Sequence, residues 1–298
     1  MTRLKKPLRV SLVGPGVVGT TLALLLWKRG HVICSVIGRR RAEAARCAKL
    51  VRCRNYSTSL GKIAPDTGLL LIATSDKSVR PVSDAVGKLR HLDFEHLVAL
   101  HTSGTLASDE LRALHAKGSA ILSFHPLQTF PQGLPLTKLV HTMEGITYGI
   151  EGTPRALTFA RRLAAGLGGR ALVIPKKEKI LYHVAGVVAS NYIAALIGAV
   201  EELVDPLGGA TALRHFRLLV ESSVRNAFGM SPRKALTGPI ARGSVEVVAR
   251  HRRALRGRRN LSALYRAVGL YTVELSRKAG RLTRKQEREL RRILSIAG

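Results

Sequence analysis

The stretch V-S-L-V-G-P-G-V-V-G-T, residues Val10 to Thr20, decides the fold of this chain. A short apolar run enters a turn that carries three glycines, and an apolar segment long enough for a helix, Val17 to Trp27, follows at once. Between a strand and a helix, Gly14 makes the tight turn, Gly16 lets the backbone approach a pyrophosphate, and Gly19 lets helix and strand pack closely. The alternative is a glycine-rich turn that binds nothing. We predict a dinucleotide whose phosphates lie on the free N–H groups at the helix N-terminus, in contact with Gly14, Pro15, Gly16, Val17, Val18 and Gly19.

Length and composition are typical of a globular protein. A chain of 298 residues, of which 46% are hydrophobic, is long enough for two domains with substantial cores. The three cysteines, Cys34, Cys47 and Cys53, form neither a C-x-x-C pair nor a metal-ligand cluster, so we expect reduced thiols and no metal site. The first residues, M-T-R-L-K-K-P, lead directly into the first apolar run and leave no room for a signal peptide. These features predict a cytoplasmic protein.

The charge balance is the most unusual global property. The chain has 49 Lys and Arg against 19 Asp and Glu, a formal net charge of +30. Such a field attracts dinucleotides, acidic substrates, RNA or anionic surfaces. Basic residues are most concentrated after Arg250. Aromatic residues, however, make up only 4% of the chain and do not alternate with the basic clusters, as a stacking surface for bases would require. We therefore interpret the clusters as solvated basic helix faces and expect no nucleic-acid partner.

The chain alternates strand and helix patterns up to Pro175 and is helical beyond it. Apolar runs of strand length recur at 8–13, 31–37, 68–74, 96–101, 120–124, 146–150 and 171–174, with a weaker one at 53–56. Helical patterns separate these runs, and five more cover 176–203, 210–227, 244–254, 261–279 and 283–296. The sequence thus predicts an α/β fold, with a doubly wound domain of parallel strands over residues 1–175 followed by an all-α domain over residues 176–298.

The most hydrophobic stretch, Ile180 to Val200, is about as long as a membrane span. It contains His183, Ser190 and Asn191, however, and such side chains are costly in lipid. We therefore expect a buried helix of a soluble protein and no membrane association.

The residues after the second predicted strand indicate which dinucleotide binds. Sites for NAD commonly have an acidic residue about 20 residues beyond the glycines, where it holds the ribose 2′-hydroxyl. Here Gly38 is followed by Arg39, Arg40 and Arg41, with no carboxylate before Glu43. A 2′-phosphate needs positive charge and forked donors, which arginine supplies. We predict NADP(H), with Arg39 and Arg40 as the main contacts; the alternative is an accidental arginine run in a very basic protein.

Polar side chains follow three of the predicted strands. Ligands of open α/β sheets bind beyond the carboxyl ends of the strands. A-T-S-D places Thr74 and Ser75 after one strand, and we assign both to the cofactor site. H-T-S-G places Ser103 after the next, and F-H-P places His125 after a third. We take Ser103 as a candidate orienting group and His125 as a candidate proton donor, although any single histidine can equally be a satisfied structural residue.

The long apolar helix carries a second set of polar residues. Lys179, His183 and Asn191 are separated by four and eight residues, so they lie roughly along one helix face, with Tyr182 and Ser190 beside it. Reduction of a carbonyl or imine needs a donor to the atom that gains electron density, and each of the three residue types can serve. The alternative is that these side chains are paired at a domain interface.

A constrained loop lies between two predicted helices, in the segment A-L-T-G-P-I-A-R-G-S from Ala235 to Ser244. If this loop folds over the cleft, Arg242 can hold a substrate carboxylate through two parallel hydrogen bonds. The segment can equally be a plain connector.

Taken together, the motifs resemble a bacterial family called domain of unknown function 2520, within the 6-phosphogluconate-dehydrogenase-like proteins. The resemblance covers nearly the whole chain, and its specific motifs are F-H-P-L-Q-T-F at 124–130, Y-H-V-A-G-V-V-A-S-N-Y at 182–192 and L-T-G-P-I-A-R-G at 236–243. It implies an N-terminal Rossmann domain, a helical C-terminal domain that mediates dimerisation, and an NADP-dependent oxidoreductase activity. The resemblance does not specify the substrate.

More distantly the chain is similar to ketopantoate reductase, the β-hydroxyacid dehydrogenases and pyrroline-5-carboxylate reductase. In the hydroxyacid dehydrogenases a Lys-x-x-x-Asn pair on the long helix acts in catalysis. Here the residue four after Lys179 is His183, and Asn191 comes later. The resemblance therefore implies the location of the catalytic groups rather than their roles.

The sequence leads to one main functional hypothesis. We expect an NADP(H)-dependent reductase or dehydrogenase that moves hydride between nicotinamide and a small, anionic oxo acid, hydroxy acid or imine in an interdomain cleft, in a cytoplasmic homodimer. A regulatory or scaffold protein that binds NADP without turnover is the main alternative. A basic binder of anions or RNA, built on the same domain, is the third.

Overall fold

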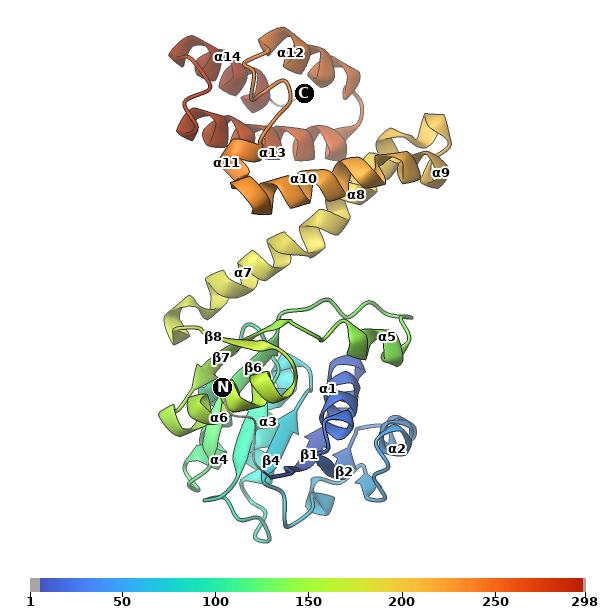
Figure 1. Ribbon diagram of the computed structural model, residues 1–298, viewed down its shortest axis with the longest axis vertical. Helices are drawn as coiled ribbons and strands as arrows, with labels where there is room; N and C mark the ends of the chain where they lie inside the picture. The colour runs from blue at the N-terminus through green and yellow to red at the C-terminus, as the bar shows by residue number, and fades with distance from the viewer. Residues whose placement is uncertain (1–5, 297–298) are drawn as a thin grey trace. The chain divides into compact units, whose positions relative to one another are not determined.

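The computed structural model describes residues 6–296 and divides the chain into two compact units, Met1–Tyr192 and Ile193–Gly298 (Figure 1). The first unit holds the β-sheet and the second is helical. The boundary expected near Pro175 falls just after the last strand, whereas the compact units divide further along the chain. The helix that follows the sheet is included in the first unit because it is bonded to strand residues through Lys179 and Tyr182.

The first unit is built on an eight-stranded sheet with the order β3-β2-β1-β4-β5-β6-β7-β8. The chain passes outward from β1 to β3 on one side and from β4 onward on the other, which is the doubly wound arrangement predicted from the sequence. The topological switch point lies between β1 and β4. The strands are β1 Arg9–Val13, β2 Val32–Ile37, β3 Tyr56–Ser57, β4 Leu69–Ile72, β5 Val98–His101, β6 Ala120–Pro126, β7 Thr147–Gly152 and β8 Arg170–Val173.

The expectation that all strands are parallel is wrong at one position. Strand β7 pairs antiparallel with β6, so that His125 lies opposite Gly149. A parallel connection must cross back to the other end of the sheet. The segment between these strands cannot do so, because its helix α5 (Leu136–His141) packs at the carboxyl edge and places Val140 and Met143 in the core beside α1 (Val17–Lys28). The following helix, α6 (Pro154–Gly166), does cross, and β8 is parallel to β7.

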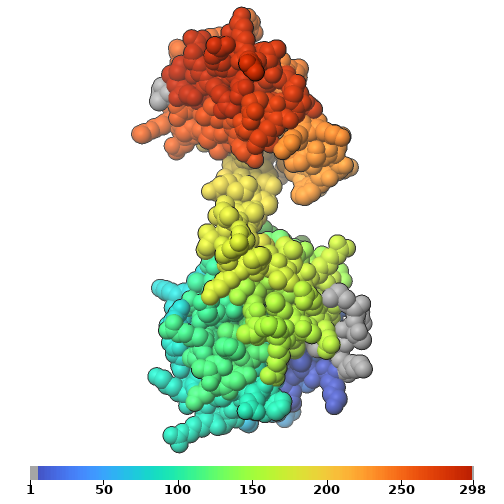
Figure 2. Space-filling model, turned by 90° about the vertical axis from the view of Figure 1, so that its left-hand side faces the viewer, coloured from blue at the N-terminus to red at the C-terminus, as the bar shows by residue number. Residues whose placement is uncertain are grey.

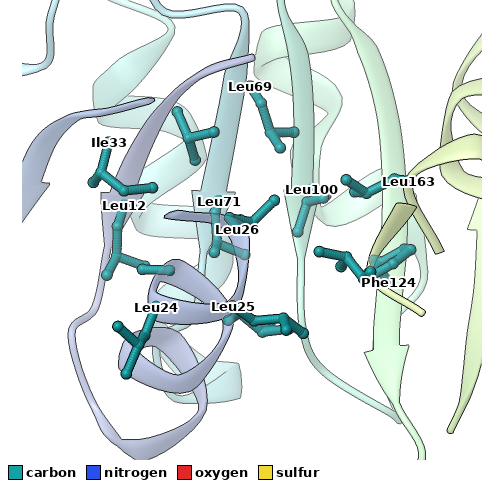
Figure 3. Packing of buried hydrophobic residues seen from close by; sticks show 14 of the residues in the cluster. Leu12, Leu24, Leu25, Leu26, Ile33, Leu69, Leu71, Leu100, Phe124 and Leu163 are labelled. Atoms are coloured by element: carbon teal, nitrogen blue, oxygen red, sulfur yellow. The ribbon is translucent and has the colours of Figure 1, made fainter. Parts of the chain in front are cut away.

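Helices cover both faces of the sheet, and the side chains of the central strands alternate between two cores. In β4, Leu69 and Leu71 join one core while Leu70 and Ile72 join the other. Figure 3 shows the first core, in which Leu12 and Leu71 meet the leucines of α1. A continuous apolar strand is expected when both faces of a parallel sheet are buried. The other helices of this unit are α2 Arg41–Leu50, α3 Asp76–Val86, α4 Arg112–His115 and α7 Lys179–Ala189, with short 3-10 turns at Leu60–Lys62, Ser108–Leu111 and Lys176–Glu178.

Three helical predictions need correction. The predicted helix over 210–227 is divided by the 3-10 turn Arg214–Phe216 into α9 (Ala210–Leu213) and α10 (Arg217–Met230). The helical pattern between the predicted strands 96–101 and 120–124, over 105–117, does not form one helix: it begins with a loop, and Ser108–Leu111 and Arg112–His115 form the 3-10 turn and α4. Residues 176–203 are not one uninterrupted helix either, because the backbone at Ser190 leaves helical values (φ −128°, ψ −70°) between α7 and α8 (Asn191–Leu203). The Ser190 hydroxyl donates to the Gly186 carbonyl at 2.7 Å, a bond of the kind that bends helices.

The second unit has a small core formed by its last three helices. α12 (Val245–Ala254), α13 (Arg259–Lys278) and α14 (Arg284–Ser295) contribute Val248, Val273, Leu290 and Leu294. Helix α14 begins with a capping box, in which Thr283 accepts from the N–H of Gln286 and the Gln286 side chain accepts from the N–H of Thr283. The remaining helices are α9 Ala210–Leu213, α10 Arg217–Met230 and α11 Pro232–Ala235, with 3-10 turns at Asp205–Leu207 and Arg214–Phe216.

The apolar helical stretch Lys176–Leu203 is the one segment, among the described residues, long and apolar enough to cross a membrane. The prediction that this stretch is buried is wrong for a single chain, because none of the residues in its most apolar part is buried. Its side chains lie at the surface in the segment drawn in yellow in Figure 2. The apolar pattern therefore does not come from burial within a single chain.

Candidate functional site

The three glycines of the first turn are required for three different reasons. Gly14 has φ +93°, and a Cβ there would lie 2.6 Å from the carbonyl oxygen of Ala73. A Cβ at Gly19 would lie 3.0 Å from the Ala73 Cβ, so this glycine lets α1 approach the sheet. At Gly16 nothing lies within 4 Å of the Cβ position. Gly14 and Gly19 are therefore needed by the fold, whereas the open space at Gly16 is available to a ligand.

The N-terminus of α1 suits an anion. Gly16 is its N-cap residue, no side chain caps it, and its first turn has no acidic residue. The first N–H groups of a helix carry partial positive charge and have no partner within the helix. Val17 and Val18 begin the helix beside the open space, and the Thr20 hydroxyl donates to the Pro15 carbonyl at 3.1 Å, which ties the turn to the helix.

The arginine run lies next to this turn. A Cβ at Gly38 would lie 2.9 Å from the Pro15 ring, so the end of β2 packs directly on the turn. The exposed side chains that follow differ in their partners. Arg40 pairs with Glu43, and the Arg41 guanidinium lies 5.3 Å from the centre of the Tyr56 ring. Arg39 has no ion pair with any residue in the described part of the chain, and is the freest of the three to meet a phosphate.

Thr74 and Ser75 follow β4 on the other side of the turn. The N–H of Thr74 lies 2.9 Å from the Cβ position of Gly14. The Thr74 hydroxyl is buried and has no hydrogen-bond partner among residues 6–296. Ser75 is the N-cap residue of α3, and its hydroxyl lies 3.0 Å from that of Ser78. An orphaned buried hydroxyl next to the glycine turn is consistent with a ligand that binds there.

A cluster of imidazole and phenol groups lies beyond the ends of β5 and β6. The His125 Nδ1 atom is hydrogen-bonded to the Tyr182 hydroxyl at 2.9 Å, and the rings of His125 and His183 are 6.0 Å apart. Gly104 makes room for both histidines, since its Cβ would lie 2.6 Å from Nδ1 of His183 and 3.0 Å from Nε2 of His125. Nδ1 of His183 is buried without a hydrogen-bond partner in the described part of the chain.

Burial changes the protonation of this cluster. Desolvation, with smaller contributions from the charges of His183 and Lys179, lowers the pKa of His125 to about 4. Desolvation also raises the pKa of Tyr182 to about 12. At neutral pH both groups are therefore uncharged in the ligand-free protein. If the Tyr182 hydroxyl donates to Nδ1, the proton of His125 resides on Nε2, the atom that faces Gly104.

Lys179 lies beneath this cluster rather than in the open. Its side chain is 1% exposed, and its ammonium group donates to the Ser123 hydroxyl at 2.7 Å. That hydroxyl donates in turn to the carbonyl of Ser103 at 3.1 Å. Burial lowers the pKa of Lys179, while the charges of Glu151 and Asp76 oppose the shift. The lysine thus joins α7 to the ends of β5 and β6.

Ser103 organises the loop that follows β5. Its hydroxyl accepts from the N–H groups of Thr105 at 3.2 Å and Leu106 at 3.1 Å. Its own N–H donates to Nδ1 of His101 at 3.2 Å, and Nε2 of His101 lies 3.1 Å from the Ala107 carbonyl. Nε2 therefore carries the proton of His101, and burial lowers the pKa of this histidine to about 4.

The structure brings together some of the predicted catalytic residues and not others. His125, His183, Lys179 and Ser103 belong to one continuous arrangement in the first unit. Asn191 lies apart from it, exposed at the start of α8, where its side-chain oxygen accepts from the Ser190 hydroxyl. Arg242 belongs to the second unit and is exposed in the turn before α12.

Sequence reasoning missed several members of the cluster. It gave Tyr182 no role and did not consider Ser123 or Gly149 as parts of the site. A Cβ at Gly149 would clash with the Tyr182 ring, so a glycine on β7 admits the phenol. The i, i+3, i+4 spacing of Lys179, Tyr182 and His183 was a usable signal for the phenol. The pairing of Gly149 with His125 depends on the antiparallel strand and could not be foreseen.

Metal coordination is not indicated by the geometry. No group of three or more His, Cys, Asp or Glu side chains that could hold a metal ion occurs within residues 6–296. The three cysteines are free thiols, and burial raises the pKa of Cys47 to about 11.

Part of the chain matches a known protein family. Residues 146–272 match the family described as domain of unknown function 2520, which confirms the resemblance expected from the motifs in that segment. No match was found among curated proteins.

Three solved structures are similar to the chain over most of its length. A provisionally assigned NADP oxidoreductase from Bacteroides fragilis is 21% identical with a TM-score of 0.74, and the match covers 90% of this chain and 98% of that one. A Thermotoga maritima protein is 24% identical with a TM-score of 0.64, covering 95% and 98%. The 1-pyrroline-5-carboxylate reductase of Streptococcus pyogenes is 14% identical with a TM-score of 0.62, covering 96% and 99%. At these identities the likeness shows the fold: a Rossmann domain followed by a helical region.

Proposed function

We propose that this chain is an oxidoreductase that binds NADP(H) at the glycine turn and transfers hydride between the nicotinamide and a small oxo acid, hydroxy acid or imine. The observation that carries the proposal is the open, uncapped helix end at Gly16, at the same sheet edge as the half-buried His125–Tyr182 pair. The ends of β1, β4, β5 and β6 are successive neighbours at that edge. The turn and the pair are thus three strand steps apart, about 14 Å at the usual strand spacing.

The residues around the turn fit a dinucleotide. The pyrophosphate would lie at Gly16 and the start of α1, where the N–H groups of Val17 and Val18 face it without a competing side chain. The orphaned Thr74 hydroxyl gains an acceptor when a ligand lies beside the turn. The nicotinamide, when bound, supplies or accepts the hydride.

His125 is the proposed proton donor in the direction of reduction. Its Nε2 atom is not the one bonded to Tyr182, and it lies beside Gly104, which Nδ1 of His183 also approaches. The ring is neutral without ligands, because burial lowers its pKa to about 4. Anionic groups beside an imidazole favour its charged form and raise its pKa. A carboxylate-bearing substrate therefore increases the fraction of His125 that can donate a proton, while the Tyr182 hydroxyl fixes the orientation of the ring.

Two further residues have supporting roles in this proposal. Lys179 holds the ends of β5 and β6 at fixed spacing through Ser123 and Ser103, and its buried positive charge favours an anionic substrate. His183, with one unpartnered ring nitrogen among the described residues, is available to bind the substrate. The roles of Asn191 as a donor to the substrate and of Arg242 as a ligand of a substrate carboxylate stay predictions.

The preference for NADP(H) rests on Arg39 and Arg40. Replacing them in an Arg39→Asp, Arg40→Ser variant should abolish the preference for NADPH over NADH, because the 2′-phosphate then meets a carboxylate instead of guanidinium groups. The control is Arg161→Ser, Arg162→Ser on α6, which removes two exposed arginines of the same unit and should keep the preference. Nucleotide affinities measured by calorimetry decide the matter. An unchanged preference in the first variant would contradict the assignment.

Turnover separates an enzyme from a regulatory NADP-binding protein. NADPH oxidation should be measured against a panel of 2-oxo acids and cyclic imines, including 1-pyrroline-5-carboxylate. We expect turnover with at least one member that is lost in His125→Phe. Tight NADPH binding with no turnover across the panel would favour the regulatory alternative.

We also propose that the protein acts as a cytoplasmic homodimer. Within α10 of the second unit, Leu218 is 74% exposed and Phe228 is 90% exposed, which is unusual for large apolar side chains of a soluble monomer. A second copy of the chain would cover this face. Light scattering coupled to gel filtration should give twice the chain mass, and a monomer would contradict the proposal.

A further inference from the structure

A cavity lined by arginines lies in the second unit, far along the chain from the glycine turn. It is formed by α12, the start of α13 and the end of α14, and has a volume of about 740 Å³. Five arginines line it, at positions 252, 253, 256, 259 and 266. None of them takes part in the function proposed above.

The charge of this cavity is not balanced by nearby carboxylates. Between Glu246 and Glu274 the sequence has no acidic residue. Glu274 on α13 and Glu287 on α14 are engaged elsewhere, since both pair with Arg277 and Arg291. Among the described residues, none of the five arginines of the cavity forms an ion pair. Like charges held this close repel one another, so the arrangement costs stability unless an anion joins them.

Two of the arginines are held in fixed positions. Arg252 donates to the Ser262 hydroxyl and, at 2.7 Å, to the Ile296 carbonyl, and Arg266 donates to the same carbonyl at 2.9 Å. The Nε atoms of both are buried without a hydrogen-bond partner in the part of the chain that the structure describes. A buried guanidinium donor without an acceptor is unfavourable. Both side chains are therefore preorganised, with donors still to satisfy.

We propose that this cavity is a binding site for a small phosphorylated molecule. Guanidinium groups match phosphate oxygens through paired hydrogen bonds, and several arginines around one cavity can hold more than one phosphate group. The volume falls within the usual range for small-molecule sites. Apolar side chains such as Leu255 and Ile293 complete the wall, and they suit the organic part of such a ligand.

Nucleic acid fits the cavity less well. Sites for single strands combine basic grooves with aromatic side chains on which bases stack. No aromatic residue of the described chain lines this cavity. Tyr265, which precedes the cavity residue Arg266 on α13, is hydrogen-bonded through its hydroxyl to His251 at 2.8 Å. The cavity thus offers charge and forked donors without a stacking platform.

The test is a calorimetric titration of the full-length protein with pyrophosphate and inorganic triphosphate. Because the glycine turn is itself expected to bind phosphates, the titration is made in a Gly16→Val background, in which that turn is blocked. We expect triphosphate to bind more tightly than pyrophosphate, and a variant with Arg253→Ser and Arg256→Ser to bind at least about 10-fold more weakly. Both arginines are exposed, so folding is preserved.

The matched control removes two arginines of the same unit that lie outside the cavity. Arg284→Ser with Arg288→Ser on α14 lowers the net charge equally and should leave the affinity unchanged. If both double variants weaken triphosphate binding equally, binding depends only on the overall positive charge of the protein, and the proposal is overturned. The absence of any triphosphate binding would overturn it as well. Tighter binding of a 20-nucleotide RNA than of triphosphate, with the same dependence on Arg253 and Arg256, would overturn it in favour of nucleic acid. Failure of NADPH binding at the glycine turn would leave this result unaffected.

Discussion

The glycine turn and the histidine cluster lie at the same edge of one sheet but are built in different ways. The turn offers backbone N–H groups around open space, and no titratable side chain forms part of it. The cluster offers half-buried imidazole and phenol groups, and desolvation shifts the pKa values of His125 and Tyr182 in opposite directions. The contrast implies that nucleotide binding depends on shape and changes little with pH, whereas turnover depends on protonation.

Replacing His125 should separate the two regions most clearly. His125→Phe removes the proposed donor, and general acid catalysis typically contributes about 10²- to 10⁴-fold, so kcat should fall by that factor. The affinity for NADPH should stay the same, because the turn is untouched. Steady-state kinetics and calorimetry measure the two effects. A loss of NADPH affinity equal to the loss of kcat would mean that the regions are not separate.

Blocking the turn should produce the converse. Gly16→Val places a side chain in space that is empty in the structure, so the fold should be retained while a pyrophosphate is excluded. We expect the Kd for NADPH to rise at least about 100-fold, equivalent to about 2.7 kcal/mol. Gly166→Ala is the control, because its Cβ also meets nothing within 4 Å but lies at the end of α6. Unchanged NADPH binding in Gly16→Val would place the nucleotide elsewhere.

The cluster should make stability depend on pH. His101 and His125 have folded-state pKa values of about 4, below the ordinary value of 6.5, so the unfolded chain binds more protons between these limits. Stability is therefore full above pH 6.5 and falls as the pH decreases toward 4. Between pH 7 and pH 5, each histidine should lower the free energy of unfolding by about 2 kcal/mol. Urea titrations measure it, and His101→Asn should show a smaller loss; an identical profile in that variant would refute the assignment.

The smallest expected effect concerns Tyr182. Tyr182→Phe keeps the ring and removes the hydroxyl that orients His125. A hydrogen bond of this kind contributes about 1 kcal/mol, so kcat should fall about 5-fold and the affinity for NADPH should not change. A fall as large as that of His125→Phe would show that the tyrosine itself transfers the proton.

Features with local causes were predictable from the sequence. The roles of Gly14 and Gly19 follow from strand, turn and helix within one short segment, and the structure places each as expected. Strand β4 could be predicted because burial on both faces produces a continuous apolar run. The resemblance to known motifs also singled out the segments that carry His125 and His183, whose rings the structure brings to 6.0 Å from each other.

Features set by tertiary packing could not be predicted. The antiparallel strand β7 depends on α5 remaining at the carboxyl edge, and only this places Gly149 beneath Tyr182. The burial of Lys179 against Ser123 joins residues far apart in the sequence. The long apolar helix was expected to be buried because apolar residues usually are, yet a single chain leaves it exposed.

The most direct test of the central claim is a calorimetric titration of the unmodified protein with NADPH, and separately with NADH, at pH 7.5. We predict one nucleotide site per chain and an affinity for NADPH at least about 10-fold higher than for NADH, since the proposal assigns Arg39 and Arg40 to the 2′-phosphate. No binding of NADPH, or tighter binding of NADH, would contradict the account.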